Sequence, residues 1–251
     1  MKRKVITVVI AIILVSLTAV PAVSLDEAQE LLIKIDEMAN FGGTDFSAMM
    51  SMISEDPEAG IEKTVVQQFR SDDDDKFLML INEPIIQKGQ GYLMVDNNLW
   101  FYDPESRKFS HTSMNDQFNG SDANNSDFNA SSVVDDYRVK SIEEGKLGKY
   151  AVYILELEAK NNEVTYQTQK IWVTINGTLT LKTEDYSAGG RLMRTSYYPS
   201  YANASGNFIP TKTIFVDGLI KGKKTTITIS DISTEDIPDM VFTKSYIERV
   251  N

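Results

Sequence analysis

The hydrophobic period of this 251-residue chain changes from about 3.6 to 2 near Asp45, and this change constrains the fold more than any other feature. Before it, the segment Asp26–Asn40 carries its apolar residues on one stripe at helical spacing, and Gly42 and Gly43 then favour a turn. After it, short alternating segments separated by turns continue almost to the C-terminus. The sequence therefore predicts one N-terminal amphipathic helix followed by a mainly β domain.

Turn dipeptides such as Asn176-Gly177 and Asp217-Gly218 separate several of the alternating segments. We expect strands at Phe46–Ser54, Ile61–Arg70, Lys76–Asn82, Gly91–Val95, Leu99–Tyr102, Lys108–Thr112, Tyr137–Ile142, Tyr150–Glu158, Val164–Ile175, Leu179–Tyr186, Arg191–Tyr198, Ile209–Val216 and Lys223–Ser230. Sequential antiparallel pairing is the simplest topology, and it predicts a large curved antiparallel sheet or an unclosed β-barrel. A chain of this length fits one domain, residues 23–251.

The first 22 residues have the features of a secretory signal peptide. Lys2, Arg3 and Lys4 precede the aliphatic run Val5–Ala19, which is shorter than the roughly 20 residues of a membrane span. Cleavage after Ala22 would keep Ser24 for a capping box with Glu27, cleavage after Ser24 would not, and an uncleaved membrane anchor is the alternative to both. The sequence predicts export in each case.

Charge and composition exclude several classes of function. The signal peptide holds three of the 25 basic residues and none of the 36 acidic ones, so its removal changes the net charge from −11 to −14. Such an acidic surface repels phosphate backbones and anionic head groups, so we expect no nucleic-acid partner and no stable adsorption to membranes. The absence of Cys excludes disulfides, thiolate metal sites, cysteine nucleophiles and a lipid-modified N-terminal Cys.

The motifs for catalysis and metal binding are incomplete. His111 is the one histidine, and no G-x-S-x-G motif accompanies it. The glycines of Gly218–Thr225 have the wrong spacing for a phosphate-binding loop. Asp122, Asn124, Ser126 and Asp127 could offer oxygens to Ca²⁺, but the glycine and glutamate of a helix-loop-helix site are missing, and Asp72–Asp75 is interpreted as a solvated hairpin tip. We therefore predict a binding protein with no catalytic residues, no metal and no cofactor.

One helix cannot cover the inner face of so large a sheet, so the apolar residues there either fill a closed core or accept a ligand. The segment Met114–Asp136, rich in Asn, Asp, Ser and Gly, is interpreted as a flap at the mouth of such a cavity.

Five N-x-S/T sites are available for glycosylation if the source organism modifies exported proteins, although turn chemistry also explains them. They are Asn119, Asn124, Asn129, Asn176 and Asn203.

Three local motifs resemble those of a known family. The segments Lys88–Val95 and Asn98–Arg107 are similar to a glycine-strand-turn-"LWFYDP" hairpin, Gly120–Phe128 is similar to a loop after the next strand, and Ile237–Thr243 is similar to a C-terminal ending. The family is that of the outer-membrane lipoprotein-sorting proteins, the LolA/LolB-like superfamily with its uncharacterised relatives. The resemblance extends from about Leu25 to Val250.

The resemblance implies an unclosed β-barrel with short helical lid elements and a hydrophobic cavity that shields acyl chains of a lipoprotein or lipid. It implies a periplasmic or other extracytoplasmic location, an envelope membrane protein as donor or acceptor, and a monomer. Arg70 and Arg107 are candidates for the gating basic residue by their place in the hairpins. The alternatives are a sensor or protein-interaction module on the same fold without lipid, and a hydrolase that uses His111.

Leu, Met and aromatic side chains suffice to hold an acyl chain. We predict a lid stripe on the N-terminal helix and a set of wall residues on the strands, although ordinary core packing explains each residue equally well. The lid stripe is Leu31, Leu32, Ile35 and Met38, and the wall residues are Leu93, Trp100, Tyr102 and Trp172. The cluster of Met49, Met50 and Met52 is interpreted in the same two ways.

Overall fold

The computed structural model describes residues 23–40, 44–129, 133–162, 164–176, 179–204 and 206–250. Helix α1, Leu25–Ala39, begins and ends one residue before the predicted segment Asp26–Asn40, and Ser24 and Glu27 form a capping box. In this box the Glu27 backbone N–H donates to Ser24 Oγ at 3.2 Å, and the Ser24 backbone N–H donates to Glu27 Oε2 at 2.8 Å. The predicted signal peptide and the glycine pair after the helix lie outside the described residues.

The described part of the chain forms one 13-stranded antiparallel sheet that does not close. Its strands are β1 Phe46–Asp56, β2 Gly60–Ser71, β3 Lys76–Glu83, β4 Gly91–Val95, β5 Asn98–Asp103, β6 Lys108–His111, β7 Tyr137–Leu147, β8 Tyr150–Ala159, β9 Thr168–Thr174, β10 Thr180–Tyr186, β11 Leu192–Ala204, β12 Asn207–Asp217 and β13 Lys224–Ser233. The predicted fold class, mainly β with an unclosed curved sheet, is confirmed.

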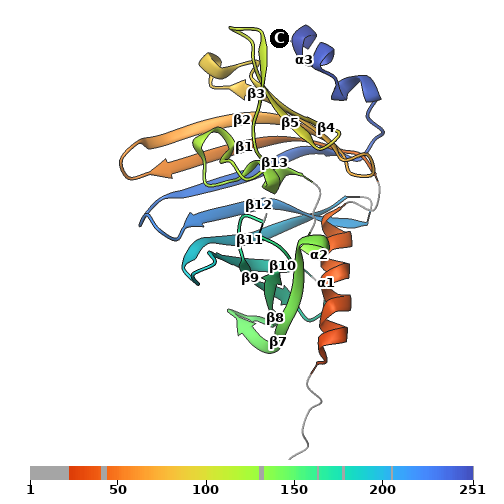
Figure 1. The fold of residues 1–251 in the computed structure, drawn as a ribbon, viewed down its shortest axis with the longest axis vertical. Helices are drawn as coiled ribbons and strands as arrows, with labels where there is room; N and C mark the ends of the chain where they lie inside the picture. Colours follow the sequence, from red (N-terminus) through yellow and green to blue (C-terminus); the bar gives the residue numbers. More distant parts are fainter. Residues whose placement is uncertain are drawn as a thin grey trace, which may run out of the picture.

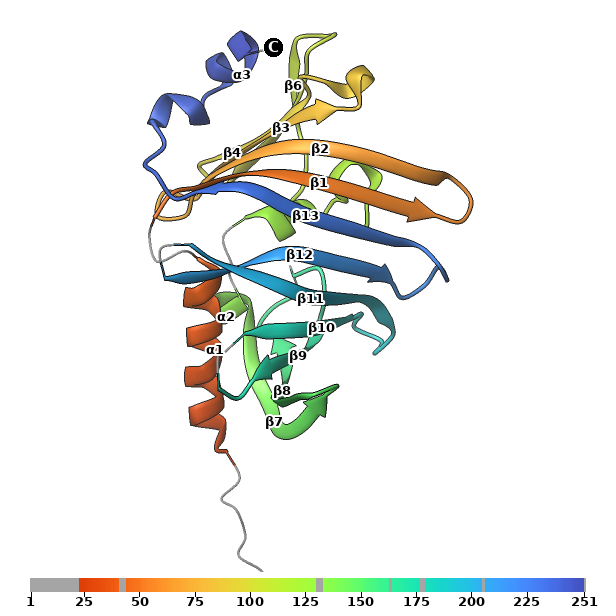
Figure 2. The same ribbon diagram turned by 180° about the vertical axis from the view of Figure 1, so that it is seen from behind.

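The pairing departs from a simple sequential order at one place. The spatial order runs from β6 through β1 to β13 and then down to β7, so the first and last strands of the chain pair in the middle of the sheet. Strands β6 and β7 are therefore the two free edges, and a long segment connects them across the sheet (Figures 1 and 2). The length of this connecting segment explains why β6 and β7 do not pair, because a tight turn would have made them neighbours in the sheet.

Each face of the sheet has its own cover. Strand β3 is buried on both faces: Phe77, Met79 and Ile81 belong to one apolar cluster, and Leu78 and Leu80 belong to another. The second cluster packs under the C-terminal segment, which contains the 3-10 turn η5, Asp239–Phe242, and helix α3, Lys244–Val250. We call this face the outer face and the opposite one the inner face.

Helix α1 covers part of the inner face. Its Leu32 and Ile35 pack with Leu155, Leu157, Ile171 and Val173 of β8 and β9, and helix α2, Val133–Asp136, adds Val133 and Val134. Figure 1 shows α1 and α2 beside β7–β10, while α3 lies at the far end of the molecule beside β3–β5. None of the helices in the described residues is long and apolar enough to cross a membrane.

The connection between β6 and β7 is packed into the molecule. We call residues Ser113–Asn129 the inner loop, and it contains the 3-10 turns η3, Phe118–Gly120, and η4, Asn125–Phe128. Phe118, Ala123 and Phe128 are buried in the same cluster as Phe77 and Met79, so the loop fills the inner face over β1–β5. It is more than the flap predicted from its composition, because two aromatic side chains anchor it in the core.

Candidate ligand cavity

Beside the inner loop the inner face is hollow. A cavity of about 600 Å³, which we call the main chamber, lies between β1, β2 and β11–β13 on one side and the ends of the inner loop and of α1 on the other. A second cavity of about 250 Å³, the side chamber, lies beneath α1 against β9, β10 and β11. Aliphatic and aromatic side chains line both chambers, and Met38, Phe208 and Pro210 line the two together. Polar side chains also line the main chamber, among them Arg70, Asn115, Asp136 and Asn161.

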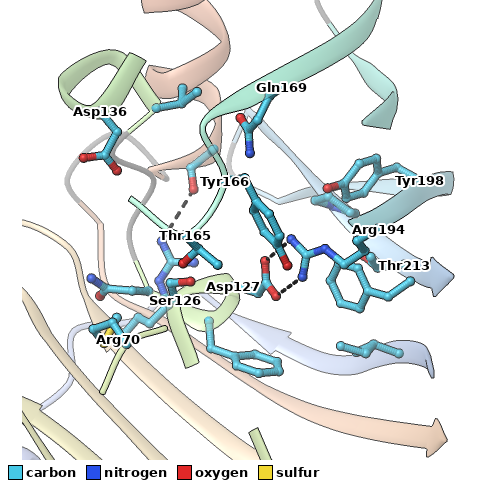
Figure 3. A pocket seen from close by; sticks show the side chains of 18 of the residues that line it. Arg70, Ser126, Asp127, Asp136, Thr165, Tyr166, Gln169, Arg194, Tyr198 and Thr213 are labelled. Carbon is cyan, nitrogen blue, oxygen red and sulfur yellow. Dashed lines mark hydrogen bonds and ion pairs between the residues drawn. The ribbon is translucent and has the colours of Figure 1, made fainter. Parts of the chain in front are cut away.

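Arg194 of β11 is the centre of a charged network where the chambers meet. Its Nε donates to Asp185 Oδ2 at 2.9 Å, and its Nη1 and Nη2 donate to the two carboxylate oxygens of Asp127 at 2.5 and 3.0 Å. Asp185 comes from β10 and Asp127 from the inner loop, so the arginine ties the loop to the sheet. Figure 3 shows Arg194 and Asp127 facing each other, with Tyr166 beside them.

Burial defines the electrostatics of this network. Burial raises the pKa of Asp185, whose side chain is 1% exposed, although Arg194 and Gln169 oppose that rise. Burial would lower the pKa of Arg194, but the charges of Asp127 and Asp185 hold it well above its ordinary value. Burial also raises the pKa of Tyr198 to about 12. At neutral pH the cavity therefore presents a charged arginine already paired with carboxylates, and an uncharged tyrosine.

A second tie fixes the middle of the inner loop. The Asp122 backbone N–H donates to Thr225 Oγ1 at 3.0 Å, and Lys223 Nζ lies 3.7 Å from Asp122 Oδ1. Burial raises the pKa of Asp122, opposed by Thr225 and Lys223. The Gln68 side chain donates to the Phe128 carbonyl at 2.6 Å. The loop is thus held in its middle and near its C-terminal end, and Met114, Asn115 and Ser126–Asn129 line the main chamber.

Arg70 and Arg107, the two arginines with a predicted gating role, have different surroundings. Arg70 lines the main chamber and forms a bidentate ion pair with the Asp72 carboxylate, with N···O distances of 2.7 and 2.8 Å. Its Nη2 also lies 3.5 Å from the Ala39 carbonyl at the end of α1. Arg107 lies in the turn between β5 and β6 and lines neither chamber. Only the place of Arg70 fits a contact between the sheet and the helix.

The predicted lid stripe divides along its length. Met38 lines both chambers and Ile35 lines the side chamber. Leu31 and Leu32 pack in the cluster between α1 and β7–β9 and line neither chamber. The C-terminal half of the helix is therefore the part that faces the cavity.

The four predicted wall residues line neither chamber. Leu93 and Tyr102 pack on the outer face with Val241, Phe242 and Ile247 of the C-terminal segment. Trp100 lies between His111, with ring centroids 3.5 Å apart, and Lys244, whose Nζ is 3.2 Å from the ring centroid.

Lys182 Nζ lies over the ring of Trp172, 4.2 Å from its centroid. Of the methionine cluster, Met50 and Met52 are buried in the inner-face core and Met50 also lines the main chamber. The structure therefore puts the cavity wall on other side chains of the strands.

Sequence reasoning missed the charged network and the residues around it. The available signal was a charged residue at an inward position of an otherwise alternating strand. Arg194, Ser196 and Tyr198 share one face of β11, and the first two are buried. Asp185 occupies a buried position of the neighbouring strand, and opposite charges at inward positions of paired strands indicate a buried ion pair.

The structure also places the candidates for catalysis, metal binding and glycosylation. His111 is exposed at the end of β6 and contacts Trp100. Within the described residues no group of three or more His, Cys, Asp or Glu side chains could hold a metal ion. Asn119 is half-buried and bonds Thr64 and Gln87, and Asn124 and Asn129 lie in the inner loop, whereas Asn176 and Asn203 are exposed.

Comparison with known proteins identifies the fold. A LolA superfamily protein from Nitrosomonas europaea is 28% identical, with 87% of this chain and 98% of that chain covered and a TM-score of 0.76. An outer-membrane lipoprotein-sorting protein domain from Vibrio parahaemolyticus is 19% identical, with 90% and 100% covered and a TM-score of 0.80. A DUF1329 family protein from Desulfovibrio piger is 20% identical, with 89% and 98% covered and a TM-score of 0.79.

No curated protein matches the chain. A family model described as that of an uncharacterized protein matches residues 73–249. This range covers most of the sheet, the inner loop and the C-terminal segment. The resemblance seen in the sequence is confirmed, and the chain belongs to this uncharacterized family with a LolA-like fold.

Proposed function

We propose that this protein is an exported, non-enzymatic carrier that shields acyl chains of a lipoprotein or lipid during transfer in the cell envelope. The observation that carries the proposal is the main chamber, which lies inside an unclosed sheet. Aliphatic and aromatic side chains such as Met50, Phe215 and Ile229 line it together with polar ones such as Asn115 and Asp136. Its volume of about 600 Å³ is within the roughly 300–1,000 Å³ of typical ligand sites.

The chemistry of the chamber suits an apolar chain. Each methylene removed from water contributes about 0.8 kcal/mol, so apolar area matters more than directional bonds. The guanidinium of Arg194 is already paired with Asp127 and Asp185, so it does not require an anionic partner from the ligand. An uncharged chain therefore enters without breaking an ion pair.

The relatives and the N-terminal sequence support the cellular role. One similar structure bears the name of an outer-membrane lipoprotein-sorting protein domain, and the predicted signal peptide directs export. We propose a monomer in the periplasm or another extracytoplasmic space, with an envelope membrane protein as donor or acceptor of the acylated cargo. The net charge of −14 after cleavage favours release from anionic membranes over stable adsorption.

The proposal is tested by native mass spectrometry of the mature chain purified without detergent, followed by lipid extraction and addition of oleic acid. We expect a stoichiometric acyl-chain adduct on the wild-type protein. Met38→Asp should lose the adduct, because Met38 lines both chambers. Ile33→Asp is the matched control on the same helix, since Ile33 is 40% exposed and should leave the adduct unchanged.

A clean apo mass with no uptake of oleic acid would overturn the carrier proposal. It would favour the sensor or protein-interaction module, which uses the same fold without lipid. An adduct lost equally in both helix variants would show that a charge on α1 disrupts folding, so circular dichroism of each variant accompanies the measurement.

A further inference from the structure

Five exposed aliphatic side chains gather at one end of the sheet. Of the large hydrophobic side chains in the described residues, the three most exposed are Ile85 at 82%, Ile61 at 75% and Ile86 at 75%. Leu219 and Ile220 are 42% and 44% exposed. Ile61 lies at the start of β2, the other two isoleucines lie between β3 and β4, and the last pair lies between β12 and β13. We call these five residues the turn patch.

The three turns that carry the turn patch lie next to one another, on the side of the sheet away from α1 (Figures 1 and 2). Strands β3, β2, β1, β13 and β12 are consecutive neighbours in the sheet, so their turns adjoin. Lys223 Nζ lies 3.8 Å from Asp56 Oδ2, which connects the β12–β13 turn to the β1–β2 turn. The Asn119 side chain donates to Thr64 Oγ1 at 3.3 Å and to Gln87 Oε1 at 3.0 Å, which connects β2 to the β3–β4 turn.

Hydrogen bonds fix the backbone beneath these exposed side chains. The Gln87 N–H donates to the Pro84 carbonyl at 2.9 Å. The backbone N–H groups of Leu219 and Ile220 donate to Asp217 Oδ1 at 2.6 and 2.8 Å. The aliphatic side chains are therefore presented on ordered turns, and binding through them requires little further ordering of the backbone.

The exposed charges on these turns balance, although the mature chain carries a net charge of −14. Three exposed carboxylates and three exposed ammonium groups surround the turn patch. They belong to Glu58, Glu62, Glu83, Lys63, Lys88 and Lys221. This end of the molecule therefore approaches lipid head groups with less repulsion than the net charge implies.

The composition of the turn patch favours a lipid surface over a protein partner. Protein interfaces depend on Trp, Tyr and Arg side chains that fill well-packed pockets. The turn patch holds only Ile and Leu on separate turns, and none of its residues lines either chamber. A bilayer accepts apolar side chains in any arrangement, and each one gains free energy when it leaves water.

From these observations we propose that the turn patch docks the protein reversibly on a zwitterionic lipid surface, with its aliphatic side chains in the head-group region. This inference goes beyond the proposed function, because it does not depend on what the chambers hold. Docking is reversible, since only five side chains enter the lipid and the net charge of −14 opposes anionic head groups. It orients the molecule with α1 away from the bilayer.

The test is co-sedimentation of the mature chain with sucrose-loaded vesicles of dioleoylphosphatidylcholine. The wild-type protein should bind, and an equal admixture of dioleoylphosphatidylglycerol should weaken binding. The double variant Ile85→Ser with Ile86→Ser should lower the partition coefficient about tenfold or more, because two aliphatic side chains no longer enter the lipid. The matched control, Ile33→Ser with Met240→Ser, changes side chains that are 40% and 50% exposed elsewhere and should leave binding unchanged.

A fluorescent label locates the contact, and the absence of Cys allows it to be attached at one position at a time. An environment-sensitive nitrobenzoxadiazole label on Ile86→Cys should shift its emission to the blue with vesicles and be quenched by brominated lipid. The same label on Met240→Cys should do neither. Thermal unfolding of each variant controls for folding, and Leu219→Ser with Ile220→Ser is a second pair if the first does not fold.

Three results would overturn the inference. They are no binding to dioleoylphosphatidylcholine, equal binding of the wild type and the Ile85/Ile86 variant, and equal spectral shifts at positions 86 and 240. Binding only to vesicles of native envelope membranes, abolished when those vesicles are treated with protease, would assign the turn patch to a membrane protein and also overturn it.

The oleic acid adduct separates this inference from the carrier function. The Ile85/Ile86 variant should keep the adduct, because neither residue lines a chamber. Failure to dock with the adduct intact would overturn the docking inference and leave the carrier function standing. A protein that docks but takes up no oleic acid would contradict the carrier function alone.

Discussion

The inner face of this sheet has a filled half and an open half, and the two differ in what covers them. Over β1–β5 the inner loop inserts Phe118 and Phe128 into the core, with ring centroids 4.9 Å apart. Between that loop and the end of α1 two chambers remain open, and β9–β13 line them together with parts of β1 and β2. One half of the sheet thus packs into the stable core, and the other half borders the two chambers.

The cover decides this difference, since strands of both halves carry apolar residues on the inner face. Phe118 packs on Tyr92 with centroids 4.7 Å apart, and both rings are buried. Phe208 in the open half is 40% exposed and lines both chambers. An aromatic residue with neighbours on all sides contributes to the free energy of unfolding, whereas one beside a chamber is available to a ligand.

The largest expected effect comes from the filled half. Phe118→Ala should lower the free energy of unfolding by about 3–5 kcal/mol, because it removes a fully buried ring and leaves a cavity. Urea unfolding of the mature chain measures this, with Tyr150→Ala as an exposed aromatic control that should change little. A loss below about 1 kcal/mol for Phe118→Ala would mean that the loop is not part of the stable core.

The second-largest loss of unfolding free energy is expected when the ion pairs of Arg194, which join the inner loop to the sheet, are broken. Arg194→Met leaves Asp185 buried without its cation, at a cost of about 2–4 kcal/mol, less than a fully uncompensated charge because Gln169 still donates to Asp185. The carboxyl can also take up a proton, since burial raises its pKa. The same unfolding experiment at neutral and mildly acidic pH checks this, and the loss should shrink as the pH falls. An equal loss at all pH values would contradict the role of Asp185.

The open half should respond in affinity and hardly in stability. Phe208→Ala should change the free energy of unfolding by less than about 1 kcal/mol, because the ring is partly exposed. Affinity for a fluorescent fatty acid should fall about fivefold, which corresponds to roughly 1 kcal/mol. If the stability falls as far as in Phe118→Ala while the affinity is unchanged, the comparison of the two halves is wrong.

The smallest effect is expected at the start of α1. Hydrogen bonds from the Ser24 backbone and side chain lower the pKa of the exposed Glu27 below its ordinary value of 4.5. The capping box therefore stabilises the helix fully above that value, and this contribution is lost as the pH falls through the lowered pKa. Hydrogen exchange of the first turn should accelerate over that acidic range in the wild type and stay independent of pH in Glu27→Gln, apart from intrinsic chemistry.

The local pattern of the sequence predicts the strands and the helix but does not tell which side of each strand belongs to the inner face of the sheet. Alternation puts Leu93 on one face and Met94 on the other, yet both are buried, because the C-terminal segment covers the outer face of β3–β5. The choice of Leu93 and Tyr102 as wall residues depended on which face is inner, and only the tertiary cover decides that. The pairing of β1 with β13 is likewise a contact between distant parts of the chain.

The candidate site itself was predicted only in part. Ile35 and Met38 follow from the helical stripe, because the stripe must face the sheet. The network of Arg194 escaped because its partners are 9 and 67 residues away along the chain, and no local period connects them. A composition rich in Asn, Ser and Gly also concealed the two phenylalanines that fix the inner loop.

A crystal structure of the mature chain with a bromine-labelled fatty acid, located by the anomalous signal of the bromine, tests whether the main chamber holds an acyl chain. We expect bromine in the main chamber, within contact of Met38, Phe208 or Ile229. Bromine on the outer face beside Trp100 and Tyr102, or an empty chamber in crystals that hold the fatty acid elsewhere, would contradict it.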